Sequence, residues 1–468
     1  MQYAVLRRAR VTFFDVALAL LAVGQLSSCS KSDGGGSSGT GGHLGGSTQQ
    51  GSGGSGSGGQ QGSGGSGSGG QQSSGGSGSG GQIAKGGTGS GGNMGSGGVV
   101  VGNGGQSGGG GQSGSGGQVG GGGSTGSGSQ YVVAMLQSTK AQATDITQSE
   151  VVDLVTDAVT KAGGLDFIKN GQTVVLKPNL VTPYSDYMNT PMSPTVNGVA
   201  TDWRIVKAVA DLVRAKNKTG KILVMEGSVV PAATAFSLMG YTKDNFGTSV
   251  DEFIAFEGAS CSDRSTDALM QKTGPGGKLF WINKRYAGAD VVISLPTMKT
   301  HLNAGITGAV KNLGIGTTPA GQYSAVVDGG TGLDCTRGQT AAFIDHSTPE
   351  LLGQFIHDYY SLRPADFVVM DALQGLQHGP ASMWSNTDYA SDKMNMRLIL
   401  AGRNAVAVDT VAALVMKCDP KLVPHLTKLE ADGLGTTDVS KISLVGKQIS
   451  DVAKPFAVNN QTAICPGQ

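Results

Sequence analysis

Residues 31–130 consist almost entirely of Gly, Ser, Gln and Thr, and this tract most strongly limits what the chain can fold into. Such a composition cannot bury enough apolar surface to form a core. The pattern QQxSGGSGSGG recurs in it with a period of 11 residues, starting at Gln49, Gln60 and Gln71. A repeat without apolar residues has nothing to stack, so it predicts no solenoid. We expect residues 29–130 to be a flexible linker with a mean reach of about 55 Å.

Folding is therefore expected in residues 131–468, which are enough for one large core or two closely packed lobes. Of the 34 basic and 33 acidic residues of the chain, five and two precede position 131, which leaves 29 and 31 and a net charge near −2. Nucleic-acid-binding proteins usually carry a basic excess or a basic stripe. The charge balance therefore argues against a nucleic-acid partner.

The N-terminus has the features of an export signal. Three arginines within residues 7–10 precede a short apolar run over residues 11–23, and Leu26-Ser27-Ser28-Cys29 follows. The order of charge, apolar run and small residues is typical of a signal peptide and too short for a spanning helix. The last four residues resemble the lipobox of bacterial lipoproteins. We expect residues 1–28 to be a signal peptide and Cys29 to carry lipid, which anchors the protein in the bacterial cell envelope; an ordinary secretory signal is the alternative.

Four further cysteines bear on redox chemistry, namely Cys261, Cys335, Cys418 and Cys465. In an exported protein they allow up to two disulfides, with three connectivities that the sequence does not distinguish. Cys418 ends an apolar helical run, which favours a buried thiol or a disulfide partner over a nucleophile. No C-x-x-C pair is present, which argues against a zinc ribbon or a ferredoxin-type iron–sulfur cluster.

Short apolar runs rich in Val, Ile and Leu alternate with helical patterns through the rest of the chain. We expect strands at 173–176, 222–225, 291–295, 367–370, 398–400 and 442–445, and helices at 203–215, 232–239, 304–313, 349–362 and 405–416. Such an alternation predicts an α/β fold, with a mostly parallel sheet covered by helices on both faces.

Polar motifs begin where these strands end. They are Lys177-Pro178-Asn179, Glu226-Gly227-Ser228, Lys299–His301, Asp371 and Arg403-Asn404. The carboxyl ends of parallel strands lie at one edge of the sheet, where open α/β sheets bind ligands. The motifs therefore predict one shared site.

The segment LPTMKTHLNAGITGAVKNLG, residues 295–314, is the richest of these motifs. With a helix starting at about Ala304, Lys299 and His301 precede its N-terminus, where free backbone N–H groups favour an anion. Lys311 and Asn312 then lie two turns further along. A surface loop with ordinary charges is the alternative.

Five segments together resemble a known family. They are KPNLV at 177–181, EGS at 226–228, LPTMKTH with GITGAVKNLGIG, DALQGLQHGP at 371–380 and AVDTVAA at 407–413. In this order they are similar to the bacterial and archaeal family called domain of unknown function 362, which has no general assigned reaction. Many members of that family carry an added ferredoxin-like domain with clustered cysteines. This chain departs from them, so the resemblance implies no iron–sulfur role here.

The candidate site residues follow from these motifs. We expect Lys177, Lys299 and Lys311 to attract a carboxylate or phosphate group. His301 is the candidate for proton transfer, because its ordinary pKa of about 6.5 allows it to take and give a proton. Glu226 is a candidate base or metal ligand. Further ligand-binding candidates are Asn179, Ser228, Thr307, Asn312, Asp371, His378 and Asp409.

Several of these residues have structural alternatives. Asn179 also suits a turn, and Asp409, on an otherwise apolar helix, suits a structural ion pair equally well. His346, His357 and His425 are interpreted as helix-cap or helix-face residues.

Three functional hypotheses remain open. The first is a cleft that binds a small anionic molecule, with His301 transferring protons; the second is a non-catalytic surface module that retains the same ligand. In a minority hypothesis, His301, His378 and either Glu226 or Asp371 bind a metal, although no H-E-x-x-H spacing supports it. The lysines can also pair with acidic residues as a buried network. The sequence names no cofactor and no substrate.

Overall fold

The computed structural model describes residues 131–228, 230, 232–256, 269–319 and 344–466. The predicted signal peptide, Cys29, the predicted linker, Cys261 and Cys335 lie outside the described residues. Within the described residues, no helix is both long and apolar enough to cross a membrane. They all belong to one compact unit.

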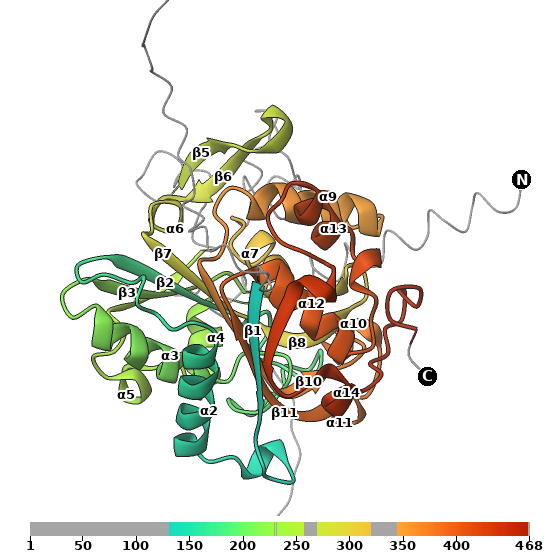
Figure 1. Ribbon diagram of the computed structural model, residues 1–468, viewed down its shortest axis with the longest axis horizontal. Helices are drawn as coiled ribbons and strands as arrows, with labels where there is room; N and C mark the ends of the chain where they lie inside the picture. Colours follow the sequence, from blue (N-terminus) through green and yellow to red (C-terminus); the bar gives the residue numbers. More distant parts are fainter. Residues whose placement is uncertain (1–130, 229, 231, 257–268, 320–343, 467–468) are drawn as a thin grey trace, which may run out of the picture. The chain divides into compact units, whose positions relative to one another are not determined.

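The main element is a mixed sheet with the strand order β12-β1-β11-β10-β7-β2-β3-β4, in which β8 joins β10 and β9 joins β8 (Figure 1). The strands are β1 (Tyr131–Gln137), β2 (Thr173–Pro178), β3 (Lys221–Glu226), β4 (Glu252–Ala255), β5 (Leu269–Thr273), β6 (Leu279–Asn283), β7 (Val291–Leu295), β8 (Thr297–His301), β9 (Gly305–Ile306), β10 (Phe367–Leu376), β11 (Lys393–Gly402) and β12 (Ile442–Gly446). Strands β10, β7, β2, β3 and β4 are parallel neighbours, and β11 runs antiparallel to both β10 and β1. Strands β5 and β6 form a separate antiparallel pair.

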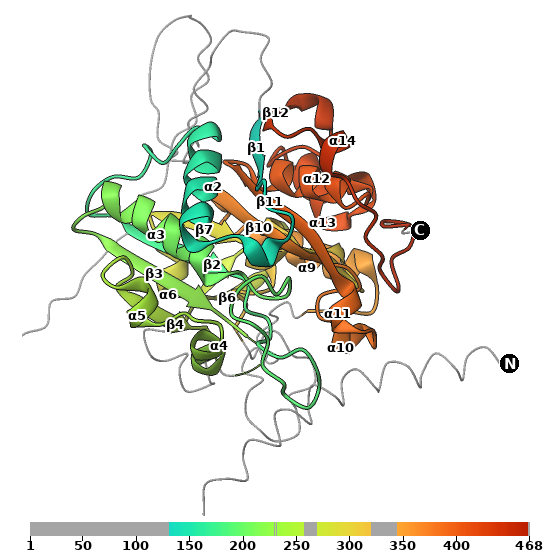
Figure 2. The same cartoon turned by 90° about the horizontal axis from the view of Figure 1, so that it is seen from below.

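Helices cover both faces of this sheet. The helices are α2 (Gln148–Lys161), α3 (Trp203–Lys216), α4 (Ala232–Leu238), α5 (Lys243–Phe246), α6 (Lys284–Ala287), α7 (Ala309–Gly314), α9 (Pro349–Tyr360), α10 (Ser382–Ser385), α11 (Tyr389–Asp392), α12 (Ala405–Val415), α13 (Pro424–Ala431) and α14 (Ile449–Val452). Figure 2 shows α2 and α3 on one side of the sheet and α12 and α13 on the other. The predicted α/β class, with a mostly parallel sheet, is confirmed.

Two apolar cores result, one on each face. Along β2, the side chains of Val174 and Leu176 join the cluster that includes α2, α3, α4 and α5, whereas Val175 joins the cluster that includes α7, α9, α12 and α13. Successive strand residues point to opposite faces, so a strand between two helical layers must be apolar throughout. This explains the apolar runs at residues 174–176 in β2 and 291–293 in β7.

The structure corrects two of the sequence-based expectations. The helix predicted from about Ala304 begins only at Ala309, because residues 297–306 form the hairpin of β8 and β9. Arg403 follows the antiparallel strand β11, whose last residue Gly402 pairs with Val368 near the start of β10. Arg403 therefore lies at the opposite edge of the sheet, where its guanidinium is 4.2 Å from the ring centre of Phe167.

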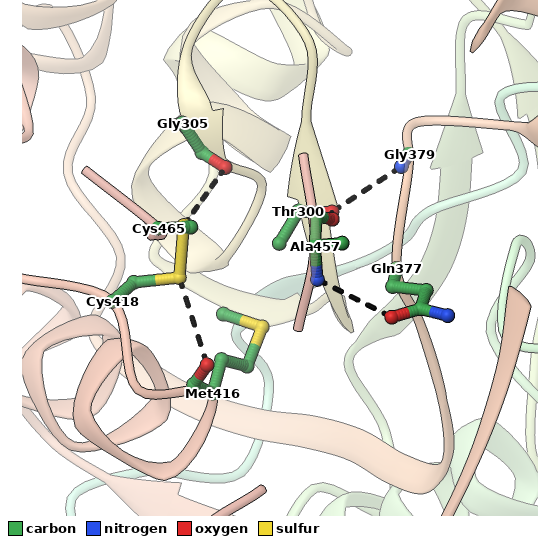
Figure 3. The surroundings of a disulfide bond; sticks show 8 residues. All are labelled: Thr300, Gly305, Gln377, Gly379, Met416, Cys418, Ala457 and Cys465. Atoms are coloured by element: carbon green, nitrogen blue, oxygen red, sulfur yellow. Dashed lines mark hydrogen bonds between the residues drawn. A yellow bond between two sulfur atoms is a disulfide. The ribbon is translucent and has the colours of Figure 1, made fainter. Parts of the chain in front are cut away.

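A disulfide joins Cys418, just after α12, to Cys465 in the C-terminal segment (Figure 3). Near it, the Cys465 Sγ atom lies 3.8 Å from the carbonyl oxygen of Gly305 in β9. The same segment lies against β8, because the Thr300 hydroxyl donates a hydrogen bond to the Ala457 carbonyl at 3.0 Å. The C-terminal segment thus packs along the β8–β9 hairpin and is covalently tied to the end of α12.

Candidate functional site

The carboxyl ends of β2, β3 and β7 bring the predicted motifs together. Lys177 lies near the end of β2, Glu226 ends β3, and β7 continues through Pro296 into β8, which carries Lys299 and His301. Helix α7 follows the hairpin and carries Lys311 and Asn312. All of these side chains are buried, so this edge of the sheet is a densely packed polar region.

Lys177 and Glu226 form an ion pair inside this region. The Lys177 ammonium donates to Oε1 of Glu226 at 2.7 Å and to the Pro178 carbonyl at 2.6 Å. Glu226 also accepts the backbone N–H groups of Leu180 and Gly227. Burial lowers the pKa of Lys177 and raises that of Glu226, while their mutual attraction opposes both changes. Because its oxygens are all engaged by the chain, Glu226 is better suited to holding β2 and β3 together than to acting as a base.

Two asparagines extend the pair into a network. The Asn312 side-chain amide donates to the Lys177 carbonyl at 3.0 Å and to the Ser294 hydroxyl at 3.2 Å. Its oxygen accepts from the Lys177 ammonium at 3.3 Å and from the Asn179 amide at 3.4 Å. Asn312 therefore fastens α7 to the ends of β2 and β7.

Lys299 is fully buried but has no carboxylate partner within hydrogen-bond reach among the described residues. Its ammonium donates to the Val199 carbonyl at 2.6 Å and to the Asn179 side-chain oxygen at 3.0 Å. Burial and the nearby Lys311 lower its pKa well below the ordinary value. Lys299 is held in place, but its charge is not neutralised by a direct partner.

His301 ends β8 and is held by backbone groups on one side of its ring. Its Nδ1 accepts the N–H groups of Asn303 and Ala304 at 3.1 and 3.2 Å. A ring nitrogen that accepts two hydrogen bonds carries no proton, so the proton of the neutral ring lies on Nε2. Burial, followed by the charge of Lys311, lowers the pKa well below 6.5. At neutral pH His301 is therefore a neutral donor through Nε2.

Lys311 is the exception within the network. It is only 9% exposed, and none of the hydrogen bonds or ion pairs of the described residues involves its ammonium group. Burial lowers its pKa to about 7, and no carboxylate acts against that change. Burying a charge without a partner is costly. Lys311 is therefore a buried amine that holds its proton less tightly than an ordinary lysine and has no counter-charge among the described residues.

Sequence reasoning missed two histidines near Lys311. His346 precedes α9, and His425 lies in α13; the charge of Lys311 lowers the pKa of both, after the larger effect of burial. His425 is completely buried, and neither of its ring nitrogens has a hydrogen-bond partner. The buried Thr307 hydroxyl, just before α7, has none either. No local motif contains the two histidines, whereas Thr307 belongs to the motif of residues 295–314; the packing of α7 against α9 and α13 brings these segments together.

Asp409 has a structural role at the start of α7. From α12 its two carboxylate oxygens accept the N–H groups of Ala309 and Val310 at 2.6 and 2.9 Å, at the first turn of α7. A side chain on Gly308 would come within 2.5 Å of Asp409, and Gly308 has a φ of 97°. The backbone N–H groups expected to attract a ligand anion are thus occupied by the chain's own carboxylate, which corrects that expectation.

The remaining candidates are hydrogen-bonded to other parts of the chain. Asp371 accepts the N–H groups of Asp202 and Leu373, and burial raises its pKa to about 7. His378 is hydrogen-bonded through Nδ1 to Asp392 at 2.7 Å. The Ser228 hydroxyl donates to the Val181 carbonyl at 3.1 Å.

The metal hypothesis needs three ligands that converge. Within the residues that the structure describes, no group of three or more His, Cys, Asp or Glu side chains is arranged to hold a metal ion. Glu226 is instead bound by Lys177, and His378 by Asp392. These two candidate ligands are therefore committed to other partners in the described region.

A family model described as "Domain of unknown function (DUF362)" matches residues 174–414, just over half of the 468 residues. The chain belongs to this family. The DUF362 match includes Lys177, Glu226, Lys299, His301, Lys311 and Asp409, so the site described above lies within the family domain.

Two proteins with similarity to this DUF362 chain extend the comparison. A thylakoid-associated protein of Synechocystis sp. is 25% identical over 279 residues, which cover 59% of this chain and 73% of that protein. The solved structure of the lactate racemase apoprotein from Thermoanaerobacterium thermosaccharolyticum aligns with a TM-score of 0.31 and 14% identity, over 58% of this chain and 54% of that one. The DUF362 chain thus spans just over half the length of that structure.

Proposed function

We propose that the protein binds a small molecule bearing a carboxylate or phosphate group at the carboxyl edge of its sheet. The binding groups are the ammonium of Lys311, the ammonium of Lys299 and Nε2–H of His301, a set that we call the anion cluster. The observation that carries the proposal is Lys311, a buried cation with no acceptor among the described residues.

The physical argument is that burying the Lys311 ammonium costs free energy that no partner among the described residues offsets. Burial removes water from Lys311, and the nearby Lys299 and His301 add positive potential or a hydrogen-bond donor in place of a carboxylate. An anion supplies the missing counter-charge, and hydrogen bonds to charged groups are the strong ones. The pair of Lys177 and Glu226 provides a neutral scaffold beside this cluster.

His301 contributes to this site as a donor and not as the base that the sequence suggests. Its Nδ1 is engaged by two backbone N–H groups, and its pKa is lowered well below 6.5 by burial. A neutral imidazole with Nε2–H free suits an oxyanion, whose negative charge it stabilises without giving up the proton.

Calorimetric titration of the full chain with acetate, succinate, citrate, sulfate and phenyl phosphate tests the proposal. At least one of these anions should bind, and Lys311→Met should weaken that binding about 10-fold or more, as expected for loss of a charged hydrogen bond. Lys218→Met is the matched control, because Lys218 is exposed in the turn between α3 and β3. Binding that is equal in the three proteins contradicts the proposal.

Two variants of His301 separate its binding role from its structural one. His301→Asn keeps a side-chain oxygen that can accept from Asn303 and Ala304, but it lacks the Nε2 donor. His301→Ala lacks both. We expect both variants to bind the anion more weakly and only His301→Ala to lose appreciable stability, measured by urea denaturation.

We also propose that the protein is exported and held in the cell envelope by lipid on Cys29. The order of arginines, apolar run and Leu26-Ser27-Ser28-Cys29 supports this proposal, and so does the disulfide of Cys418 with Cys465, because stable disulfides belong to oxidising compartments. Metabolic labelling with a fatty acid should mark the wild type and not Cys29→Ser. Labelling of both proteins, or of neither, contradicts lipid attachment at this residue.

A further inference from the structure

We propose that the contacts of His357 with Asp358 and Asp432, which we call the His357 clamp, hold α13 against α9 and open as the pH rises, and that opening weakens anion binding at Lys311. The part that concerns anion binding rests on the proposed function. The inference adds regulation to that site, through residues remote in sequence from the motifs that build it.

The ring of His357 lies between two carboxylates. Its Nδ1 is 2.8 Å from Oδ1 of Asp358, the next residue of α9, and its Nε2 is 2.8 Å from Oδ2 of Asp432, which caps the C-terminus of α13. A carboxylate only accepts hydrogen bonds, and a neutral imidazole has a single N–H group. Both contacts are therefore satisfied together only by the doubly protonated ring, the imidazolium.

Asp358 is kept ionised by its other partners. It is buried, and besides His357 it accepts from the Lys278 ammonium and from the Gln354 side-chain amide, each at 2.7 Å. Burial acts to raise the pKa of Asp358, but these hydrogen bonds together lower it. Lys278 directly precedes β6, so charged contacts run from the β5–β6 pair through α9 to the end of α13.

The charges that act on His357 come from these partners. The hydrogen bond to Asp358 has the largest effect and raises the pKa of His357; burial opposes it, and the bond to Asp432 raises the pKa further. Among the described residues, the other charged or titratable groups of α9 and of α7, α13, β5 and β6 form no hydrogen bond or ion pair with His357. They are Glu350, Tyr359, Tyr360, Lys311, His425, Lys428, Glu430 and Lys272.

Helix α9 packs against both α13 and α7, the helix that carries Lys311 (Figure 1). A side chain on Gly353 would come within 2.6 Å of Pro424 at the start of α13. One on Gly314, at the end of α7, would come within 2.8 Å of the carbonyl oxygen of Ile356, which directly precedes His357. Because contacts this close leave no gap to absorb a displacement, a shift of α9 or α13 is transmitted to α7.

The clamp weakens as the pH rises. In the unfolded chain His357 titrates near its ordinary pKa of about 6.5, whereas its pKa is raised in the folded protein. Its contribution to stability is therefore fully present below pH 6.5 and is lost as the pH rises through the raised pKa. The neutral ring then has one N–H for two carboxylates. We expect Asp432 to separate, because its side chain is 53% exposed and that of Asp358 only 2%.

Hydrogen exchange measured by mass spectrometry tests the clamp in the full chain. Peptides from α13 are compared between the wild type and His357→Gln at several values between pH 5.5 and 9, since Gln keeps one donor but carries no charge. The ratio of the two rates at each pH cancels the intrinsic pH dependence of exchange. We expect exchange in the variant to be about tenfold faster at pH 5.5 and equal to that of the wild type at pH 9.

Asp432→Asn is a second variant, at a half-exposed position that tolerates substitution. It should remove the same pH dependence, because only one carboxylate then faces the ring. Asp166→Asn is the matched control: Asp166 pairs with Lys216 of α3 at 2.6 Å, and α3 covers the other face of the sheet (Figure 2). Its α13 peptides should exchange as in the wild type.

Calorimetry with the tightest-binding anion of the panel tests the regulation. Any change in the charge of Lys311 with pH is common to the wild type and His357→Gln, so it cancels in the ratio of their affinities. We expect the wild type to bind about fivefold more tightly than the variant at pH 6 and equally tightly at pH 9.

The outcomes separate this inference from the proposed function. Exchange of α13 that is equal in the wild type and both variants at every pH overturns the clamp. An affinity ratio that is the same at pH 6 and pH 9 overturns the regulation and leaves the binding site intact. Absence of binding by every anion overturns the proposed function and the regulation with it, whereas the clamp itself then stands or falls on the exchange of α13.

Discussion

The Nζ atom of Lys177 lies 2.7 Å from Oε1 of Glu226, with both side chains almost completely inaccessible to solvent. Lys311, one residue before the Asn312 that bonds to Lys177, is buried with no such partner in the described part of the chain. Two neighbouring lysines of the same polar region thus have different roles. The first is neutralised within the scaffold, and the second leaves a charge that a ligand can satisfy.

Removing the unpaired charge should stabilise the protein. Lysine stays protonated in the unfolded chain up to its ordinary pKa of 10.5, whereas folded Lys311 loses its proton near pH 7. Below pH 7 the folded state bears the full free-energy cost of burying the charged Lys311 amine. Between pH 7 and 10.5 the unfolded chain binds more protons than the folded chain, so the free energy of unfolding rises with pH. We expect Lys311→Met to raise the free energy of unfolding at pH 7 by about 2–4 kcal/mol. The free energy of unfolding of this variant should also increase less between pH 7 and 10.5 than that of the wild type.

Urea denaturation at a series of pH values between 7 and 10 measures this effect, with Lys218→Met as the control. A variant that is more stable but binds its anion less well is expected when the replaced residue serves function at the expense of stability. A Lys311→Met variant less stable than the wild type at pH 7 would contradict the account.

Breaking the scaffold pair should have the opposite effect. Glu226→Gln leaves the Lys177 ammonium buried without a counter-charge, so we expect a loss of about 3–5 kcal/mol in the free energy of unfolding. The double variant Lys177→Met with Glu226→Gln should recover part of that loss, because no uncompensated charge remains. Denaturant unfolding of the three variants gives the coupling energy, and strictly additive losses would argue against a direct pair.

Asp409 should matter through the position of α7. Asp409→Ala leaves the N–H groups of Ala309 and Val310 buried without acceptors, at a cost of about 2–4 kcal/mol. Asp409→Asn keeps one oxygen and should cost less. Because α7 carries Lys311, both variants should also weaken anion binding, in the same order. Unchanged affinity in Asp409→Ala would show that α7 keeps its position without this contact.

The disulfide should support the hairpin that carries Lys299 and His301. Ile464, beside Cys465, packs so closely on Gly305 that a side chain there would come within 2.8 Å of it. The Cys418→Ser, Cys465→Ser double variant should lose about 2–4 kcal/mol of stability and bind the anion more weakly. Adding a reductant to the wild type should reproduce both effects, whereas a reductant that changes neither would show that the hairpin does not depend on the bond.

The sequence predicted the parallel part of the sheet well, because its signal is local. Residues 174–176 and 291–293 are apolar runs, and such runs are typical of strands buried on both faces. The convergence of Lys177, Glu226 and Lys299 then follows from the direction of the strands alone. Arg403 was misplaced because strand direction is not a local property, and nothing within residues 398–400 shows that β11 runs antiparallel.

The helix boundary near Ala304 was wrong for a different reason. The run from Leu302 to Ile306 has residues compatible with a helix, but Gly305 and Gly308 adopt φ values of 78° and 97°, which close the hairpin and place Gly308 against Asp409. His425 was not recognised because a single histidine within a helix normally has a structural explanation. Its position beside Lys311 depends on the packing of α13, which no sequence periodicity reveals.

The central claim is that a ligand anion supplies the counter-charge that Lys311 lacks, and proton uptake on binding tests it most directly. Calorimetry at pH 8, in buffers of different ionisation enthalpy, with the tightest-binding fully ionised anion of the panel, measures the number of protons taken up. Burial lowers the pKa of Lys311 to about 7, so most of it is uncharged at pH 8, and binding should take up a proton that Lys311→Met takes up to a smaller extent. Binding to the wild type without proton uptake would contradict the account.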